Sequence, residues 1–279
     1  MLGSLEVAMK NLVLLVRRTL QASAFVAALA TLLTGCGGDD NGTAANAAAM
    51  HASVSPASNV TQPVVVPADA TFAGQTYTEW ETAFWQWAMP LPLDNPPHPF
   101  SKCNAWERPI SAAQTGNVWF WSAPDLNPDG TPLTCDQSAI TIPAGKALFL
   151  TIRDIEASSL DDPPFRSDTA AGQRSIAQYW FSHIVDVFCK IDGVAVGDVQ
   201  AFHFLTPQFH FHAPTPWIFG SSGGSGTSVG EGYFLLLQLP PGPHTIHYGG
   251  DFHFNAGELG PDPVDFQKDV TLFVTIGPS

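Results

Sequence analysis

Short apolar segments limit the possible folds of this 279-residue chain more than any other sequence feature. Glycine and proline lie in nearly every gap between these segments. Such segments, rich in β-branched and aromatic residues and bounded by turn residues, predict strands. We expect strands at residues 118–121, 147–152, 181–191, 201–205, 209–212, 233–239, 244–248 and 270–276. Many short strands with such turns predict a mainly β domain, an antiparallel β-sandwich or jelly roll.

One short amphipathic helix is expected ahead of these strands. Thr76 and Glu79 have the spacing of a capping box. An aromatic stripe follows at steps of three and four residues and ends before Pro90. We interpret the stripe as the face that docks on the core rather than a surface that stacks on sugars. Glu79 and Glu81 are expected to be solvated. The stripe consists of Tyr77, Trp80, Phe84 and Trp87.

The N-terminal segment 1–35 predicts an export signal. Basic residues precede an uncharged run at 19–35, and this run has too few strongly apolar residues for a comfortable bilayer crossing. It ends in Leu33-Thr34-Gly35-Cys36, which resembles the lipobox of bacterial lipoproteins. The resemblance implies cleavage before Cys36, acylation of this cysteine and firm anchoring in a lipid bilayer by several acyl chains.

The mature chain divides into a tether and one folded domain. Residues 36–70 are mainly Ala, Asn, Ser, Thr, Gly and Pro, so we expect a disordered tether there and a single β-sandwich domain at 71–279. Removal of the signal takes away three basic residues and one acidic residue, so the net charge changes from −14 to −16. This acidity argues against nucleic acid as a partner, because binding to phosphates needs basic patches.

Three cysteines remain in the expected domain. In an oxidising compartment two of them should pair. We expect a disulfide between Cys103 and Cys135, because they flank the predicted strand at 118–121 and one bridge would join the loops on either side of it. Cys189 lies in an apolar stretch, and we interpret it as a buried free thiol.

A set of motifs in the domain resembles a family of uncharacterised bacterial secreted proteins and lipoproteins. The resemblance spans most of the mature domain, and the family brings no activity that can be transferred to this chain. Where many relatives have a plain apolar strand, this chain has the histidine-rich segment 209–212. The motifs are Tyr77-Thr78-Glu79-Trp80, Trp85-Gln86-Trp87-Ala88 and residues 114–120, 142–149, 191–193 and 241–246.

The histidines of the second half suggest a metal site. His210 and His212 are two residues apart on a strand and therefore project from one face, as a pair of ligands must. Together with His244 they resemble the metal motifs of cupins, which implies a transition metal such as zinc, copper or iron. Glu231 or Glu258 would complete the shell. The match departs from the cupin pattern, because no glutamate closely follows His212 and the second motif is one residue short.

A structural interpretation of the same histidines is the one we favour. Phenylalanine and histidine alternate at 209–212, so a half-buried strand would place phenylalanine in the core and histidine in water. The sequence contains no Walker loop, dinucleotide fingerprint or His-Glu-x-x-His motif. No catalytic residue is therefore assigned.

The sequence as a whole predicts a lipid-anchored domain of the bacterial cell envelope. In a Gram-negative organism, Gly37 after the lipidated cysteine implies sorting to the outer membrane, facing the periplasm or the surface. We expect a binding or structural role, with a glycan, a peptide or a small molecule as candidate ligands. The alternative is a metal-dependent, cupin-like enzyme.

Overall fold

The computed structural model describes residues 52–56, 60–220 and 222–278. The predicted signal peptide, Cys36 and the first part of the predicted tether lie outside these residues. In the part that is described, no helix is long and apolar enough to cross a membrane.

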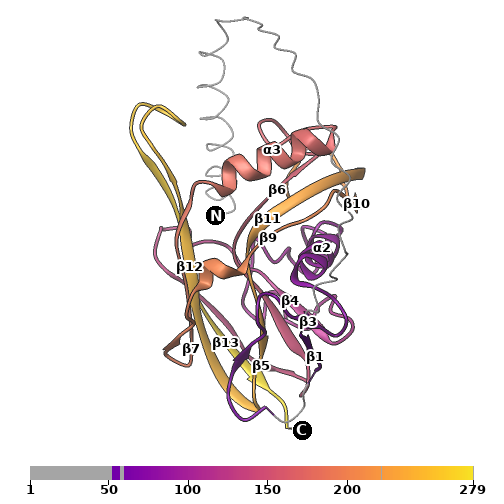
Figure 1. Cartoon of the computed structure of the whole chain (residues 1–279), viewed down its shortest axis with the longest axis vertical. Helices are drawn as coiled ribbons and strands as arrows, with labels where there is room; N and C mark the ends of the chain where they lie inside the picture. The colour runs from indigo at the N-terminus through magenta and orange to yellow at the C-terminus, as the bar shows by residue number, and fades with distance from the viewer. Residues whose placement is uncertain (1–51, 57–59, 221, 279) are drawn as a thin grey trace, which may run out of the picture. The chain divides into compact units, whose positions relative to one another are not determined.

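Two β-sheets form most of the domain (Figure 1). The first contains β2 (Val64–Val65), β4 (Val118–Trp121), β6 (Ala147–Ser158), β9 (His203–Leu205), β10 (Phe209–Ala213) and β11 (Gly224–Gln238). The second contains β5 (Leu133–Ile142), β7 (Ile184–Ile191), β8 (Val194–Ala195), β12 (Gly242–Phe254) and β13 (Val264–Ile276). The remaining elements are the pair β1 (Ser53–Val54) and β3 (Thr71–Phe72), the helices α2 (Tyr77–Ala88) and α3 (Ala170–Phe181), and the 3₁₀ turn η1 (Val199–Phe202).

The strand order gives a sandwich-like arrangement, so the predicted mainly β class is confirmed. The first sheet follows the order β10-β11-β6-β4, with β2 and β9 also paired to β11, and the second follows β5-β13-β12-β7-β8. Most neighbouring strands are antiparallel, as expected. The pairs β4 with β6, β13 with β5, and β1 with β3 are parallel, so the sheets are mixed.

The folded domain begins earlier than the predicted boundary at residue 71. Val64 and Val65 pair with the end of β11, and Val66 is fully buried with its N–H donating to the carbonyl of Leu236. Ser53 and Val54 pair with β3. The tether predicted for 36–70 is therefore wrong for the described residues of its second half. Three consecutive valines are enough to add a short strand to a sheet edge despite the polar composition around them.

Helix α2 confirms the predicted helix and its capping box. The Thr76 hydroxyl accepts from the N–H of Glu79, and the Glu79 carboxylate accepts from the N–H of Thr76. Phe84 is fully buried and makes ring contacts with Phe120, Phe149 and Phe234 of the first sheet. The aromatic stripe is therefore core, as interpreted from the sequence.

The prediction of a single helix is wrong, because α3 is a second one. Its N-cap Thr169 accepts from the N–H of Gly172. Apolar residues of α3 recur at helical spacing at 176, 177, 180 and 181, and its buried side chains are Gln173, Ala177 and Trp180. The Trp180 ring packs against Phe254 with centroids 5.0 Å apart, and the Gln173 amide donates to the carbonyl of Thr227 on β11 at 2.9 Å.

The two faces of the first sheet pack against different elements. Trp121 donates from its indole N–H to the Tyr248 hydroxyl of β12 at 2.8 Å, so this face meets the second sheet. Neighbouring residues on a strand point to opposite faces, so Phe120 and Phe149 face α2 instead. On that side Gly230 allows close packing of the helix, since a Cβ atom there would come within 2.1 Å of the Trp85 indole nitrogen.

Candidate functional site

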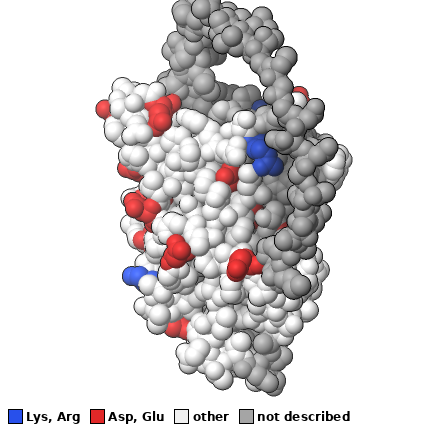
Figure 2. Space-filling view, viewed as in Figure 1, with Lys and Arg blue, Asp and Glu red and all other residues white. Residues whose placement is uncertain are grey.

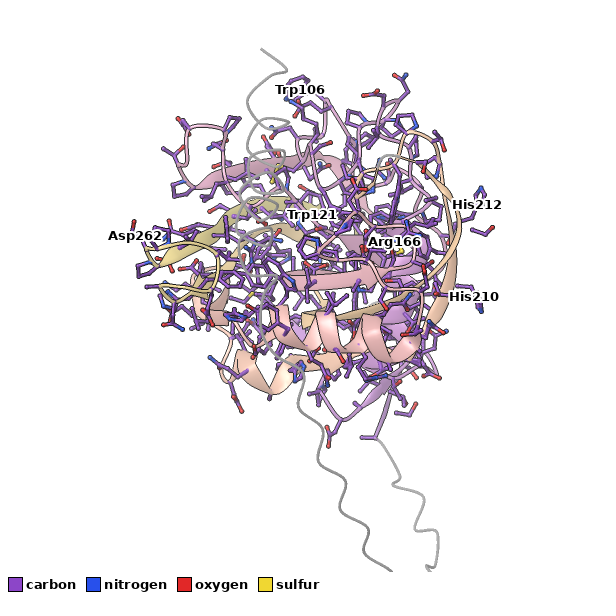
Figure 3. The ribbon with its side chains drawn as sticks, turned by 90° about the horizontal axis from the view of Figure 1, so that it is seen from above. Trp106, Trp121, Arg166, His210, His212 and Asp262 are labelled. Atoms are coloured by element: carbon purple, nitrogen blue, oxygen red, sulfur yellow. A yellow bond between two sulfur atoms is a disulfide. The ribbon has the colours of Figure 1, made fainter. Side chains whose placement is uncertain are left out.

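The histidine pair of β10 lies on the surface. His210 and His212 are exposed, whereas Phe209 and Phe211 are buried. Figure 3 shows both histidines projecting outward from the same side of the domain. The alternation expected for a half-buried strand is therefore confirmed.

The third predicted ligand, His244, is not near this pair in the fold. It is buried on β12, which belongs to the other sheet. Its two ring nitrogens lie 2.8 Å from the Asp192 carboxylate and 2.7 Å from the Pro240 carbonyl. The cupin-like site of His210, His212 and His244 is therefore not formed, because His244 lies on a strand of the second sheet and the other two histidines lie on a strand of the first. Over residues 52–56, 60–220 and 222–278, no group of three or more His, Cys, Asp or Glu side chains is arranged to hold a metal ion.

The glutamates considered as further ligands form separate pairs with other histidines. Glu231 accepts from His203 at 2.8 Å, and Glu258 lies 3.2 Å from the His183 ring. Similar cross-strand pairs join His247 to Asp269 at 2.9 Å and His253 to Asp265 at 2.7 Å. In the last pair, the hydrogen bond to Asp265 raises the pKa of His253.

An open groove runs beside β10. It has a volume of about 540 Å³ and is lined by residues of β10, of the start of β11 and of the segments before α3 and after β6. Most of its lining can donate or accept hydrogen bonds, and His212, close by, is 3.2 Å from the Ser225 hydroxyl. The arrangement suits a polar ligand that is recognised at the surface. The lining residues are Ser159, Asp168, His210, Phe211, Ser225, Gly226 and Thr227.

A second cluster of ionisable groups is buried under α2, and sequence reasoning missed it. Glu81 of α2 was expected to be solvated but is fully buried. Asp154 and Glu156 lie two residues apart on β6 and therefore share one face, and Asp161 follows in the next loop. We call Glu81, Asp154, Glu156 and Asp161 the carboxyl chain.

Burial dominates the electrostatics of the carboxyl chain. It raises the pKa of Glu81 well above the usual range, and the charges of Asp154 and Glu231 raise it further. Neither Glu81 oxygen has a hydrogen-bond partner among the described residues, although the nearby Trp85 indole lowers the pKa slightly. Burial also raises the pKa of Asp154 to about 6 and that of Asp161 to about 7.

Glu156 and Asp161 of the carboxyl chain accept hydrogen bonds from a hydroxyl group and from a backbone N–H, respectively. Ser228 donates to Glu156 at 2.6 Å, and the N–H of Ser158 donates to Asp161 at 2.6 Å. Burial and then the charge of Asp161 raise the pKa of Glu156 well above its usual value. Two such neighbouring acids retain a proton between them near neutral pH, because both cannot ionise without a counter-charge.

The cysteines of the domain are arranged as expected. Cys103 and Cys135 form a disulfide whose Cα atoms are 5.2 Å apart. Cys189 is a buried free cysteine, and burial raises the pKa of its thiol to about 12. A thiol with such a pKa is protonated and unreactive at neutral pH.

Compared with known proteins, the chain matches no protein-family model, no curated protein and no solved structure.

The surface of the domain carries the acidic character expected from the sequence. On the face shown in Figure 2, acidic side chains are scattered widely and basic ones are few.

Proposed function

We propose that this protein is an exported bacterial lipoprotein whose β-sandwich is a binding domain of the cell envelope, held to the bilayer through acylated Cys36. The signal-peptide layout and the lipobox support the anchor. The disulfide of the domain supports the location, because structural disulfides form and persist in oxidising compartments. The resemblance to secreted bacterial proteins supports the same proposal.

The groove beside β10 is the observation that carries the binding role. It combines an imidazole, a carboxylate and several hydroxyl groups on an open surface, and β10 and β11 fix their positions. His210 and Asp168 offer charge-assisted hydrogen bonds at the mouth of the groove. A glycan, a peptide or a small polar molecule of the envelope would be recognised in this way. The cupin-like enzyme loses its support, because its three histidines lie in two different sheets.

Photo-crosslinking in intact cells tests the groove. A benzophenone amino acid at Ser225, which is exposed in the groove, should give a discrete adduct, and one at exposed Gln267 on β13 should give none. In the Ser225 background, His210→Ala or Asp168→Asn should reduce the adduct about tenfold. That ratio corresponds to about 1.4 kcal/mol, in the range for a hydrogen bond to a charged group.

The matched position separates specific binding from crowding. Equal adducts from Ser225 and Gln267, or an adduct at Ser225 that neither groove substitution weakens, would contradict the proposed binding site.

A further inference from the structure

Trp106 is the most exposed large hydrophobic side chain of the described residues, with 83% of its surface accessible. It lies in the segment 103–110, which we call the Trp106 loop. Figure 3 shows it at the rim of the domain, away from His210 and His212. An indole left in water on a flexible loop would need no explanation. The Trp106 loop is, however, held rigidly.

Buried contacts fix both ends of the Trp106 loop. The disulfide ties Cys103 to Cys135 of β5. The buried Gln137 amide donates to the carbonyls of Cys103 and Arg108 at 2.7 and 2.9 Å and accepts from the N–H of Ile110 at 2.8 Å. One side chain thus satisfies three backbone groups of the loop, which is an efficient way of fixing its conformation.

The middle of the loop is attached to the free edge of β5. The N–H of Asp136 donates to the Asn104 side chain at 3.0 Å, and its carbonyl accepts from the N–H of Ala105 at 2.9 Å. Both backbone groups of Asp136 therefore point to the loop and away from β13. Trp106 follows directly after this attachment, so the fold has already lost the backbone entropy that a ligand would otherwise have to remove.

The size of the exposed surface indicates the class of ligand. A stable protein interface buries about 800 Å² on each partner, several times what one indole offers. The other exposed large apolar side chains of the described residues belong to other elements, so none of them lies in the Trp106 loop. They are Val64, Tyr179, Val185, Val194 and Phe273.

Two ionisable side chains, Lys102 and Glu107, lie close to Trp106 in the sequence. Glu107 follows Trp106 in the chain and forms an ion pair of 2.7 Å with Lys102, whose side chain is 52% exposed whereas that of Glu107 is 11% exposed. An aromatic face beside such groups fits a sugar, which presents C–H bonds on one face and hydroxyl groups around its rim. The net charge of −14 disfavours strongly anionic partners but leaves neutral saccharides unaffected.

We propose that Trp106, presented by its disulfide-fixed loop, is a stacking platform for a saccharide of the cell envelope. The ring lies against one face of a sugar residue, while Lys102, the exposed member of the ion pair, bonds to a hydroxyl group. This site is distinct from the groove beside β10, and it rests on the proposed function only for its location outside the cytoplasm.

Co-sedimentation of the mature, detergent-solubilised protein with chitin, cellulose and purified peptidoglycan sacculi tests the proposal. At least one of these probes should retain the wild-type protein. Trp106→Ala should weaken retention about tenfold or more, within the range of hot-spot aromatic residues. Trp106→Phe should keep most of it. Tyr179→Ala removes an exposed aromatic side chain from α3, so it should bind as the wild type does.

Two further readouts separate binding from folding and from membrane attachment. The melting temperature of Trp106→Ala should equal that of the wild type, because the side chain is mostly exposed. The part of the iodide quenching of tryptophan fluorescence that Trp106→Phe lacks should fall when the saccharide is present. The proposal is wrong if no probe retains the wild type, if Trp106→Ala binds undiminished, or if Trp106 is needed only for binding to phospholipid vesicles. None of these results would affect acylation of Cys36 or the adduct at Ser225, on which the proposed function depends.

Discussion

At about pH 8, Glu81→Gln is expected to raise the free energy of unfolding by about 1–3 kcal/mol, the range for a buried polar group that lacks full hydrogen bonding. Glu81 is fully buried, and its pKa is raised by burial and by neighbouring carboxylates. Its ionised form is therefore destabilising in the folded state. Below about pH 3 the side chain is protonated in both folded and unfolded chains, so this difference between the variant and the wild type should disappear.

The sign of the pH dependence follows from linkage. A carboxyl group with a raised pKa binds its proton more tightly in the folded state, so its contribution to stability is full below the unfolded pKa and is lost as pH rises through the folded pKa. With folded pKa values of about 6 for Asp154 and about 7 for Asp161, the wild type should lose stability between about pH 4 and pH 8. Urea unfolding across this window measures the loss.

Glu79 provides the matched control on the same helix. It is exposed, and its hydrogen bonds to Thr76 lower its pKa, the opposite direction to the shift at Glu81. Glu79→Gln should change stability by less than about 0.5 kcal/mol, since glutamine also serves in a capping box. Its pH dependence should match the wild type. A Glu81→Gln variant that is less stable than wild type at about pH 8 would refute the assignment of Glu81 as a destabilising buried acid.

Loss of the disulfide should produce the largest change in stability. Cys103 and Cys135 are 32 residues apart, and in the chain-entropy model closing a loop of this length contributes about 3–4 kcal/mol. The double variant Cys103→Ser with Cys135→Ser should lose about this much free energy of unfolding in urea. It should also lose binding to any saccharide that the Trp106 loop holds, because that loop begins at Cys103.

A reducing agent supplies the control for the disulfide. Dithiothreitol should destabilise the wild type by the same amount and leave the double variant unchanged. Cys189→Ala should respond to dithiothreitol as the wild type does, because Cys189 is unpaired. A wild type whose unfolding curve is unaffected by full reduction would contradict a structural role for the bridge.

The apolar centres of most long strands were predictable from the sequence, but their lengths were not, and β5 was missed entirely. Strand β4 matches its prediction residue for residue, since four large apolar residues form it. Strand β6 continues beyond the predicted end at residue 152 through the ionisable residues Arg153, Asp154 and Glu156. Arg153 is buried toward the second sheet, where it donates to the carbonyl of Phe266 at 2.9 Å. Local propensity cannot show such tertiary effects.

Some positions of ionisable groups could also be predicted from the sequence, and others could not. Glu81 could have been identified as buried, because it lies four residues after Tyr77 and three before Phe84 and therefore shares their helix face. The position of His244 could not, because no local pattern says which sheet a strand joins. The histidine–carboxylate pairs also depend on cross-strand register. The Trp106 loop left no signal, because a rigid exposed residue and a flexible one look alike in sequence.

Mass spectrometry of the mature N-terminus, on protein isolated from bacterial membranes, tests the central claim most directly. The account predicts that the first residue is Cys36, carrying a diacylglyceryl group on its sulfur and an acyl chain on its amino group, and that Cys36→Ala abolishes both. A mature chain that begins elsewhere, or one with an unmodified Cys36, would contradict the lipoprotein assignment.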